Sequence, residues 1–414
     1  MKNQYFPKIL IIGHSFNEKN GLGITLTNLF KEWPKNKIAV ISDDIDLNFC
    51  ENNRPCFSYV NVNNIDFIKN SNTNFKKIII NKLKKILRPI YYKFGFEEFN
   101  FNDKINEQIK KTIDVFEPDF YFTCLGSLNS IKFINRLLVY KEKKLVIYIV
   151  DDWPNTKFEN RVFRNYWKKR YNLQFKELLS KTTIRFSICQ SMTDSYWVKY
   201  GYYFIPFHNP IDILKWNSIN YKSKYENGIT SILYIGKINR ETKKCILDMC
   251  KVVSLLSKNA KMQIIFDIYT PDYERYKKKF EKFSYCKLYK SVSQELVPYL
   301  LRSYSILFLP IDFSPISVRY ARLSMPTKLT EYLISGIPIF LYCSKELALF
   351  EYLSKNQCAY FCSKSGIKAM QTSLFKLIID EKKQKEITKN SLHLAKIHDI
   401  SIIRENFRKS FFLS

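Results

Sequence analysis

Short apolar runs alternate with longer amphipathic stretches along the chain, and one arrangement of them occurs twice. In its first occurrence an apolar run, a polar loop, an amphipathic stretch and a second apolar run lie at residues 8–13, 14–23, 24–33 and 37–42. The same four features recur at residues 231–236, 239–244, 245–257 and 262–269. Short apolar runs between polar turns are typical of buried strands, and stretches with helical periodicity are typical of helices. The pattern therefore predicts two βαβ units and an α/β fold with two parallel sheets.

Further apolar runs extend each half of the chain. Strands are expected at 120–124, 145–150, 184–189, 306–310 and 337–342, and a helix at 165–180. The polar stretch 217–228 between the halves has the composition of a linker. We therefore expect an N-terminal domain at 1–212, a linker at 213–228, a C-terminal domain at 229–395, and a C-terminal helix at 396–414 that packs back on the N-terminal domain.

Length and composition agree with a folded protein of two domains. The chain has 414 residues, of which 46% are hydrophobic, and domains contain roughly 150 residues each. No apolar run reaches the roughly 18 to 20 residues that a membrane span needs, and the first run is too short for a signal-peptide core. The ten cysteines lack the spacing of a redox pair or a zinc site. We expect a cytoplasmic protein whose cysteines are buried free thiols.

The segment 324–338 combines signals for the start and the end of a helix. Ser324 or Thr327 can cap its first N–H groups, and Gly336 suits its end. Lys328 and Glu331, three positions apart, lie on one face of that helix. Because helix N-termini bind anions, the segment predicts an anion site. The alternative is an exposed ion pair between Lys328 and Glu331.

Basic residues give the chain a net charge of +29, which indicates an anionic partner. They are concentrated in a stretch where aliphatic residues recur at helical spacing, and its cations include Lys76, Lys77, Lys82, Lys84, Lys85 and Arg88. A basic amphipathic helix is typical of peripheral binding to an anionic membrane. The alternative is a domain helix with a basic outer face and an apolar stripe in the core. We expect no nucleic-acid partner, since no recognised nucleic-acid-binding module is present.

Five motifs in order resemble those of GT-B glycosyltransferases of the large retaining group called family 4. They are GLG at 21–23, YIVDDWP at 148–154, IPFHNPID at 205–212, LYIGK at 233–237 and SMPTKLTEYLISGIP at 324–338. The resemblance implies a GT-B fold of two Rossmann-like domains. It also implies transfer of a sugar from a nucleotide-sugar donor, held by the C-terminal half, to a glycan or lipid-linked acceptor. Neither a metal nor another cofactor is expected, because fixed cations and helix N–H groups can stabilise the leaving diphosphate.

The resemblance also assigns roles to individual residues. Those implied to bind the donor are Gly21, Gly23, Gly236, Lys237, Arg240, Lys243, Ser324, Thr327, Lys328 and Glu331. Lys237 is the first basic residue for the phosphates, and Lys243, Arg240 or Lys244 is the second. Glu331 corresponds to the glutamate that binds the ribose hydroxyls, and many relatives carry another glutamate where this chain has Leu323.

Three residues of the first half are candidates for catalysis. Asp151 and Asp152 follow a predicted buried strand, where open α/β sheets place ligand-binding groups. His14 and the 21–23 loop are expected to approach the donor phosphate or the acceptor. A cap for the following helix is the alternative role of the aspartate pair.

Other readings of these motifs are weaker. Gly21 and Gly23 with Asp43 resemble a dinucleotide fingerprint, but Leu26 stands where the third glycine is required. The acidic residues at 44–46 are interpreted as a turn. The competing functions are a nucleotide-sugar epimerase with the same fold and, less favoured, a basic nucleic-acid-binding protein. The expected role is in the synthesis of a bacterial surface polysaccharide, at the inner face of the membrane.

Overall fold

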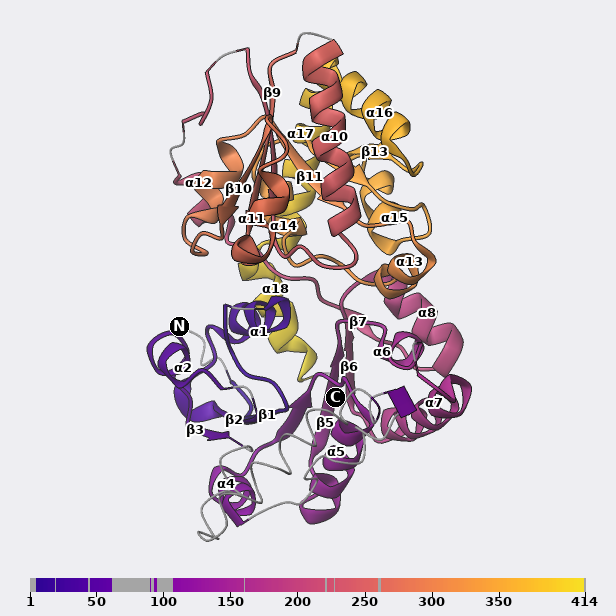
Figure 1. The fold of residues 1–414 in the computed structure, drawn as a ribbon. Coiled ribbons are helices and arrows are strands. Elements are labelled where there is room, and N and C mark those ends of the chain that lie inside the picture. The colour runs from indigo at the N-terminus through magenta and orange to yellow at the C-terminus, as the bar shows by residue number, and fades with distance from the viewer. Residues whose placement is uncertain are drawn as a thin grey trace, which may run out of the picture. The chain divides into compact units, whose positions relative to one another are not determined.

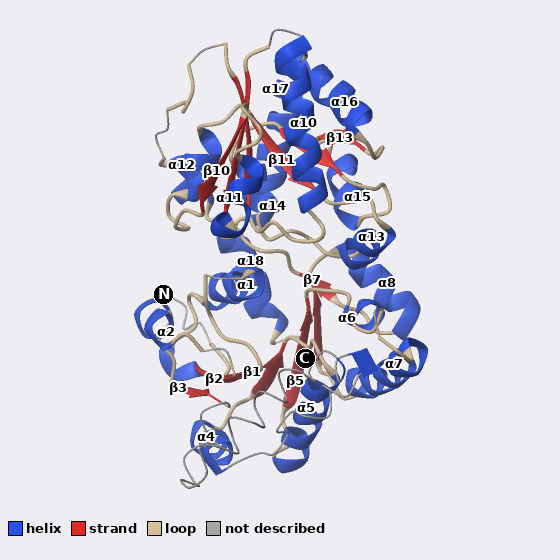
Figure 2. Ribbon diagram, in the orientation of Figure 1, coloured by secondary structure: helices blue, strands red, loops and turns tan. Residues whose placement is uncertain are grey.

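The computed structural model describes residues 5–18, 20–43, 45–61, 90, 93–94, 107–159, 161–219, 222–226, 228–259 and 262–412. The chain divides into two compact units, one formed by residues 1–207 with 404–414 and the other by residues 208–403 (Figure 1). In each unit strands and helices alternate along the chain (Figure 2). The predicted cluster of cations at Lys76, Lys77, Lys82, Lys84, Lys85 and Arg88 lies outside the described residues.

The first unit is built on a sheet in which, over the described residues, seven strands are all parallel. Their order is β3-β2-β1-β4-β5-β6-β7. The strands are β1 (Ile9–Ile12), β2 (Ile38–Ser42), β3 (Ser58–Asn61), β4 (Phe120–Thr123), β5 (Lys144–Ile149), β6 (Ile184–Ser187) and β7 (Ile205–Pro206). Since β1 lies between β2 and β4, the strand order reverses there, which in open α/β sheets is where ligands bind.

Helices of the first unit connect successive strands. They are α1 (Gly21–Phe30), α2 (Leu47–Asn53), α4 (Glu107–Phe116), α5 (Leu128–Tyr140), α6 (Trp153–Thr156), α7 (Arg164–Ser180) and α8 (Gln190–Tyr200), with a 3-10 turn at Lys35–Lys37. The end of the chain completes this core, because α18 (Ile400–Ser410) continues from the second unit into the first. Phe407, which is fully buried, packs edge-on against Phe30 and lies 6.2 Å from Phe122, measured between ring centroids.

The second unit contains, among its described residues, a sheet of six parallel strands in the order β10-β9-β8-β11-β12-β13. The strands are β8 (Thr230–Ile235), β9 (Ile264–Thr270), β10 (Cys286–Lys290), β11 (Ile306–Pro310), β12 (Ile339–Tyr342) and β13 (Tyr360–Cys362). Every residue of β11 and β12 is buried, as expected for central strands covered on both faces.

Helices cover the second sheet. They are α9 (Ile213–Asn217), α10 (Lys243–Asn259), α11 (Tyr273–Phe280), α12 (Val297–Arg302), α13 (Pro315–Ala321), α14 (Leu329–Ile334), α15 (Ala348–Lys355), α16 (Ile367–Ile379) and α17 (Glu381–Ala395), followed by a 3-10 turn at Lys396–His398. Helices α10 and α16 pack against each other and against the sheet, and α14 packs against α17. The core between α10, α16 and the strands is aliphatic and aromatic, with Met249, Phe266 and Leu374 fully buried.

The predicted α/β class with two parallel sheets is confirmed. Several boundaries differ from prediction. Helix α1 begins at Gly21 rather than at residue 24, so Gly21 and Gly23 form its first turn and not a loop. Helix α10 begins at Lys243 rather than at residue 245, so Lys243 does not lie in the loop before it. Helix α9 lies inside the stretch expected to be a linker. All ten cysteines are buried free thiols, as predicted. None of the helices in the described part of the chain is long and apolar enough to cross a membrane.

Candidate functional site

The loop after β8 forms the first part of a polar site at the carboxyl edge of the second sheet. The Tyr234 hydroxyl donates to the Lys237 carbonyl at 2.6 Å, and the Ile238 N–H donates to Asp272 at 2.9 Å. Gly236 has a φ of +138°, a conformation that side chains with a Cβ rarely adopt. These contacts fix the backbone of the loop and leave the Lys237 side chain exposed.

Lys328 lies against the same loop. Its Nζ donates to the Ile235 carbonyl at 2.8 Å and lies 4.3 Å from the centroid of the Tyr234 ring. A Cβ built on Gly236 would lie 3.3 Å from this Nζ, so glycine leaves room for the ammonium group beneath the backbone. Burial lowers the pKa of Lys328 to about 7, because the charged form loses hydration that the protein only partly replaces. Its charge is therefore sensitive to any anion that binds beside it.

Glu331 is partly buried one turn away on α14. Its Oε1 accepts a hydrogen bond from Nε2 of Gln294. Burial raises the pKa of Glu331 to about 7, although the bond from Gln294 acts in the opposite direction. The interpretation of Lys328 and Glu331 as an exposed ion pair is not supported, since each has a different partner and neither is exposed. Gln294 was missed in the sequence, where nothing links it to a residue 37 positions later.

The start of α14 differs from prediction. The helix has six residues, and its N-cap position is occupied by Lys328, which makes no side-chain cap bond. Neither Ser324 nor Thr327 therefore occupies the N-cap position. The Ser324 hydroxyl donates to the Tyr320 carbonyl at 3.4 Å. The N–H of Leu329 instead bonds to the Pro326 carbonyl at 2.9 Å, so a backbone turn replaces the cap.

The segment that precedes α14 is also held by a residue that is distant in sequence. Nδ2 of Asn209 donates to the Thr327 carbonyl at 3.3 Å. Leu323, at the position where many relatives of the resembled family carry a glutamate, is buried, with 6% of its surface exposed. It belongs to the apolar core and offers no polar group to a ligand.

The remaining cations at this edge are exposed. Lys237 and Arg240 are on the loop after β8, and Lys243 lies in the first turn of α10 with its Nζ 5.5 Å from the Tyr276 ring centroid. Loop and helix are fixed relative to each other, because the N–H of Lys243 bonds to the Asn239 carbonyl at 3.0 Å. The structure therefore brings Gly236 and Lys328 together, and it leaves Lys237, Arg240, Lys243 and Lys244 exposed.

The first unit has a cavity of about 240 Å³ at the carboxyl ends of β1, β2 and β4. Its lining includes His14, Asp43 and Ser127. Nε2 of His14 lies 2.6 Å from the Cys124 carbonyl oxygen, a hydrogen bond that fixes the ring at the cavity wall. The cavity coincides with the reversal of strand order between β1 and β4, where the topology predicts a ligand.

Asp151 and Asp152 have different surroundings after β5. Asp152 is buried, with 1% of its surface exposed, and its carboxylate accepts hydrogen bonds from Tyr196 at 3.0 Å and from Asn155 at 2.9 and 3.0 Å. It occupies the N-cap position of α6 but makes no side-chain cap bond. Asp151 is exposed. Of the two, Asp151 is the carboxylate that a substrate can reach.

Gly23 is required by a close approach inside the first unit. A Cβ at this position would lie 2.3 Å from the side chain of Asn17. Oδ1 of Asn17 accepts the Asn20 N–H at 3.1 Å, and Oδ1 of Asn20 accepts the Gly23 N–H at 2.8 Å. The two asparagines shape the start of α1, and the sequence pattern gave no reason to single out Asn17. In the described part of the chain no group of three or more His, Cys, Asp or Glu residues is arranged to hold a metal.

No protein-family model matches the chain, and no curated protein matches it in sequence. Solved structures do resemble it. HepE of Anabaena, solved with UDP and glucose, has a TM-score of 0.64 at 10% identity, and the match covers 99% of this chain and 100% of HepE. A glycosyltransferase of Rickettsia africae matches with a TM-score of 0.62 at 10% identity, covering 99% of this chain and 100% of that one.

A third similar structure is described as a UDP-N-acetylglucosamine 2-epimerase of Listeria monocytogenes. Its TM-score is 0.53 at 10% identity, and the match covers 93% of this chain and 91% of that one. At such identities the likeness concerns the fold. The two parallel sheets and the match over the full length of glycosyltransferase structures show that this chain has the GT-B fold.

Proposed function

We propose that the protein is a glycosyltransferase that moves a sugar from a nucleotide-diphosphate-sugar donor to a glycan or lipid-linked acceptor. The observation that carries this proposal is the position of Lys328 and Glu331, one turn apart at the carboxyl edge of the second sheet. A cation beside the backbone of Gly236 suits a diphosphate, and a partly buried carboxylate suits a vicinal diol. The similarity to HepE, which was solved with UDP and with UDP-glucose, supports a nucleotide-sugar as the donor.

In this proposal the second unit binds the donor. Glu331 accepts hydrogen bonds from the ribose hydroxyls, and Gln294 orients its carboxylate through the bond at Oε1. Lys237 and Lys328 face the diphosphate, with Arg240 or Lys243 as the second exposed cation. Helix α14 is short, so these side chains contribute more to binding the diphosphate than its dipole does.

Transfer breaks the bond between the sugar's anomeric carbon and the diphosphate oxygen and forms one to the acceptor oxygen. Negative charge develops on the departing diphosphate, where Lys237 and Lys328 stabilise it, so the proposed reaction needs no metal. The acceptor hydroxyl gives its proton to the departing diphosphate oxygen as the new bond forms. His14 and Asp151 in the first unit are the residues that we assign to the acceptor and the reacting sugar. Asp152 supports them by fixing the loop through Tyr196 and Asn155.

We place the enzyme in bacterial surface polysaccharide synthesis, at the inner face of the membrane, with retention of anomeric configuration. The net charge of +29 and the basic stretch that contains Lys82 and Lys85 support contact with anionic lipid. Sedimentation with vesicles tests this part separately. Equal binding to anionic and neutral vesicles would contradict it.

The donor site is tested by thermal unfolding with a panel of nucleoside diphosphates. A ligand at about 100 times its Kd stabilises the folded state by about 2.7 kcal/mol, which gives a readable rise in Tm. Lys237→Ala and Glu331→Gln should each reduce the rise for the best nucleotide. Lys376→Ala, which removes an exposed lysine from α16, is the control. An undiminished rise in both site variants would refute the assignment.

An epimerase of nucleotide sugars is the second candidate function, favoured by the likeness to the Listeria monocytogenes structure. The two functions differ in their need for an acceptor. An epimerase converts the donor sugar without any acceptor present, whereas a transferase gives only slow hydrolysis. Mass spectrometry cannot separate epimers, so the donor should be followed by NMR.

A further inference from the structure

We propose that a basic groove along α17 binds an extended acidic segment of a partner protein. The groove has a volume of about 960 Å³ and lies entirely within the second unit. Thr230 and Ser305 line it at the amino ends of β8 and β11, so it lies at the opposite end of that sheet from Gly236 and Lys237. It is therefore separate from the proposed donor site.

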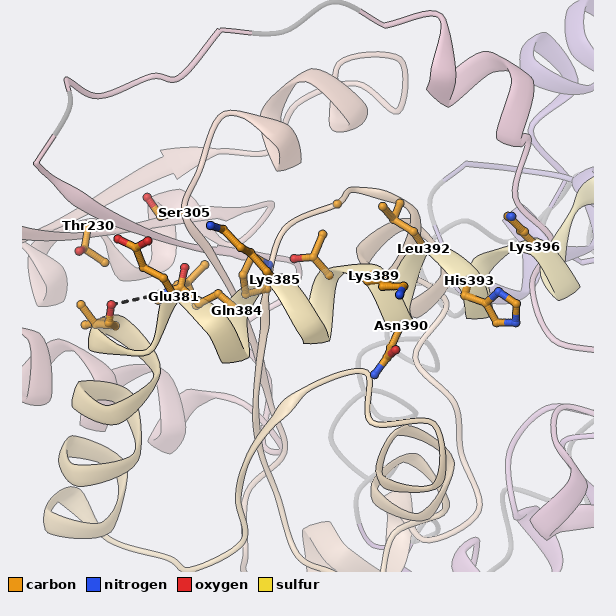
Figure 3. A pocket seen from close by; sticks show the side chains of 15 residues that line it. Thr230, Ser305, Glu381, Gln384, Lys385, Lys389, Asn390, Leu392, His393 and Lys396 are labelled. Carbon is orange, nitrogen blue, oxygen red and sulfur yellow. Dashed lines mark hydrogen bonds between the residues drawn. The ribbon is translucent and has the colours of Figure 1, made fainter.

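Three lysines line the groove on α17 and at the start of the 3-10 turn that follows it. Figure 3 shows the side chains of this helix following one another along the groove. Lys385, Lys389 and Lys396 are exposed, and none of them has a carboxylate within ion-pair distance among the described residues. Among the described residues that line the groove, the one carboxylate is Glu381, in the first turn of the helix. An uncompensated row of cations attracts an anionic ligand.

The spacing of the lysines fits an extended chain. Lys385 and Lys389 are four residues apart on a helix, which is about 6 Å along its axis. Alternate side chains of an extended peptide are about 6.6 Å apart and point the same way. Carboxylates at every second position can therefore face both lysines. From Lys385 to Lys396, the residue that follows α17, the chain rises about 16 Å, the length of about five extended residues.

Apolar residues also line the groove, and they can receive the peptide side chains between the acidic positions. These residues are Ile306, Pro338, Ile378 and Leu392. A peptide in which acidic and aliphatic residues alternate would direct its carboxylates to the lysines and its aliphatic side chains to these apolar residues. Such a ligand uses both the charge and the apolar surface of the groove.

Other polyanions fit the groove less well. Single-stranded nucleic acids are held by aromatic side chains on which the bases stack, and none of the described residues that line the groove is Phe, Tyr or Trp. A lipid bilayer is flat, whereas the lysines lie along a concavity. The geometry thus favours an acidic peptide over RNA and over a membrane.

The test measures fluorescence anisotropy of a labelled peptide of about eight residues that alternates glutamate and valine, with glutamine in place of glutamate in the control peptide. The protein is the full chain, and salt is held near 0.1 M. The paired charge reversal Lys385→Glu with Lys389→Glu should weaken binding about tenfold or more, since two attractions become repulsions. The neutral pair Lys385→Gln with Lys389→Gln should give a smaller loss in the same direction.

The matched control is Lys368→Glu with Lys376→Glu, which changes the net charge equally but on the exposed face of α16, outside the groove. It should change the Kd by less than about twofold. If the reversal on α16 weakens peptide binding as much as the reversal on α17, only the overall charge attracts the peptide, and the proposal is overturned. Equal binding of the glutamine peptide, or tighter binding of an oligouridylate of equal charge, would also overturn it. Circular dichroism and the Tm of each variant verify that the protein remains folded.

Discussion

Nucleotide binding should be strongest near pH 7 and should fall on both sides, because the site holds two groups of opposite kind with a pKa of about 7. Lys328 binds a diphosphate best when it is protonated, and Glu331 accepts from a ribose best when it is ionised. The bound anion raises the pKa of Lys328, so binding above pH 7 requires proton uptake. The bound diol favours the carboxylate and lowers the pKa of Glu331, so binding below pH 7 requires proton release.

The size of the effect follows from the two pKa values. With a pKa of about 7, Lys328 is half protonated at pH 7 and about 1% protonated at pH 9, so affinity should fall by up to about 50-fold over that interval. Between pH 7 and pH 6 the ionised fraction of Glu331 falls about fivefold. The second pKa of a phosphate is about 6, so the ligand itself also gains protons at the acid end.

Isothermal titration calorimetry from pH 6 to 9 measures both limbs, using the nucleoside diphosphate that stabilises the protein most. Its 2′,3′-dideoxy analogue has the same phosphates but no diol, and it serves as the control for ligand ionisation. The affinity of the analogue should still fall above pH 7. Below pH 7 it should lack the part of the fall that protonation of Glu331 causes. Lys328→Met should remove the fall above pH 7. If the affinities of Lys328→Met and of the unchanged protein fall in parallel above pH 7, burial does not lower the pKa of Lys328 into this range.

Three substitutions test the framework by urea unfolding. Gly23→Ala should lower the free energy of unfolding by about 1 to 3 kcal/mol through overpacking, whereas Gly126→Ala, with its nearest atom at 3.6 Å, should lower it much less. Asp152→Asn should cost about 1 to 3 kcal/mol, because a buried hydrogen-bonded carboxylate is replaced by an amide that also donates. Phe407→Ala should cost about 3 to 5 kcal/mol. Phe412→Ala, at a residue 48% exposed, should cost under about 0.5 kcal/mol. A control that loses as much as its partner would contradict the corresponding contact.

Much of the fold could be predicted because its signals are local. The apolar runs at 306–310 and 37–42 coincide with β11 (Ile306–Pro310) and β2 (Ile38–Ser42). A strand buried on both faces must be apolar along its whole length, so it is recognisable without knowledge of its neighbours. Helix boundaries were less accurate. The prediction placed a cap at Ser324 or Thr327, whereas a backbone turn at Pro326 sets the start of α14.

The sequence by itself determined the alternation of strands and helices, and it singled out Gly236, Lys328 and Glu331 by residue type and order. Only the tertiary structure decided the hydrogen-bond partners and the pKa values of Lys328 and Glu331. The end of β8 places the Ile235 carbonyl and the Tyr234 ring against Lys328, and Gln294 reaches Glu331 from a distant loop. A pKa depends on the groups and the solvent that surround a side chain in space, and those neighbours come from positions far apart in the chain. The periodicity of a sequence indicates which residues face a core, but it does not indicate which polar groups from distant segments meet in the folded protein.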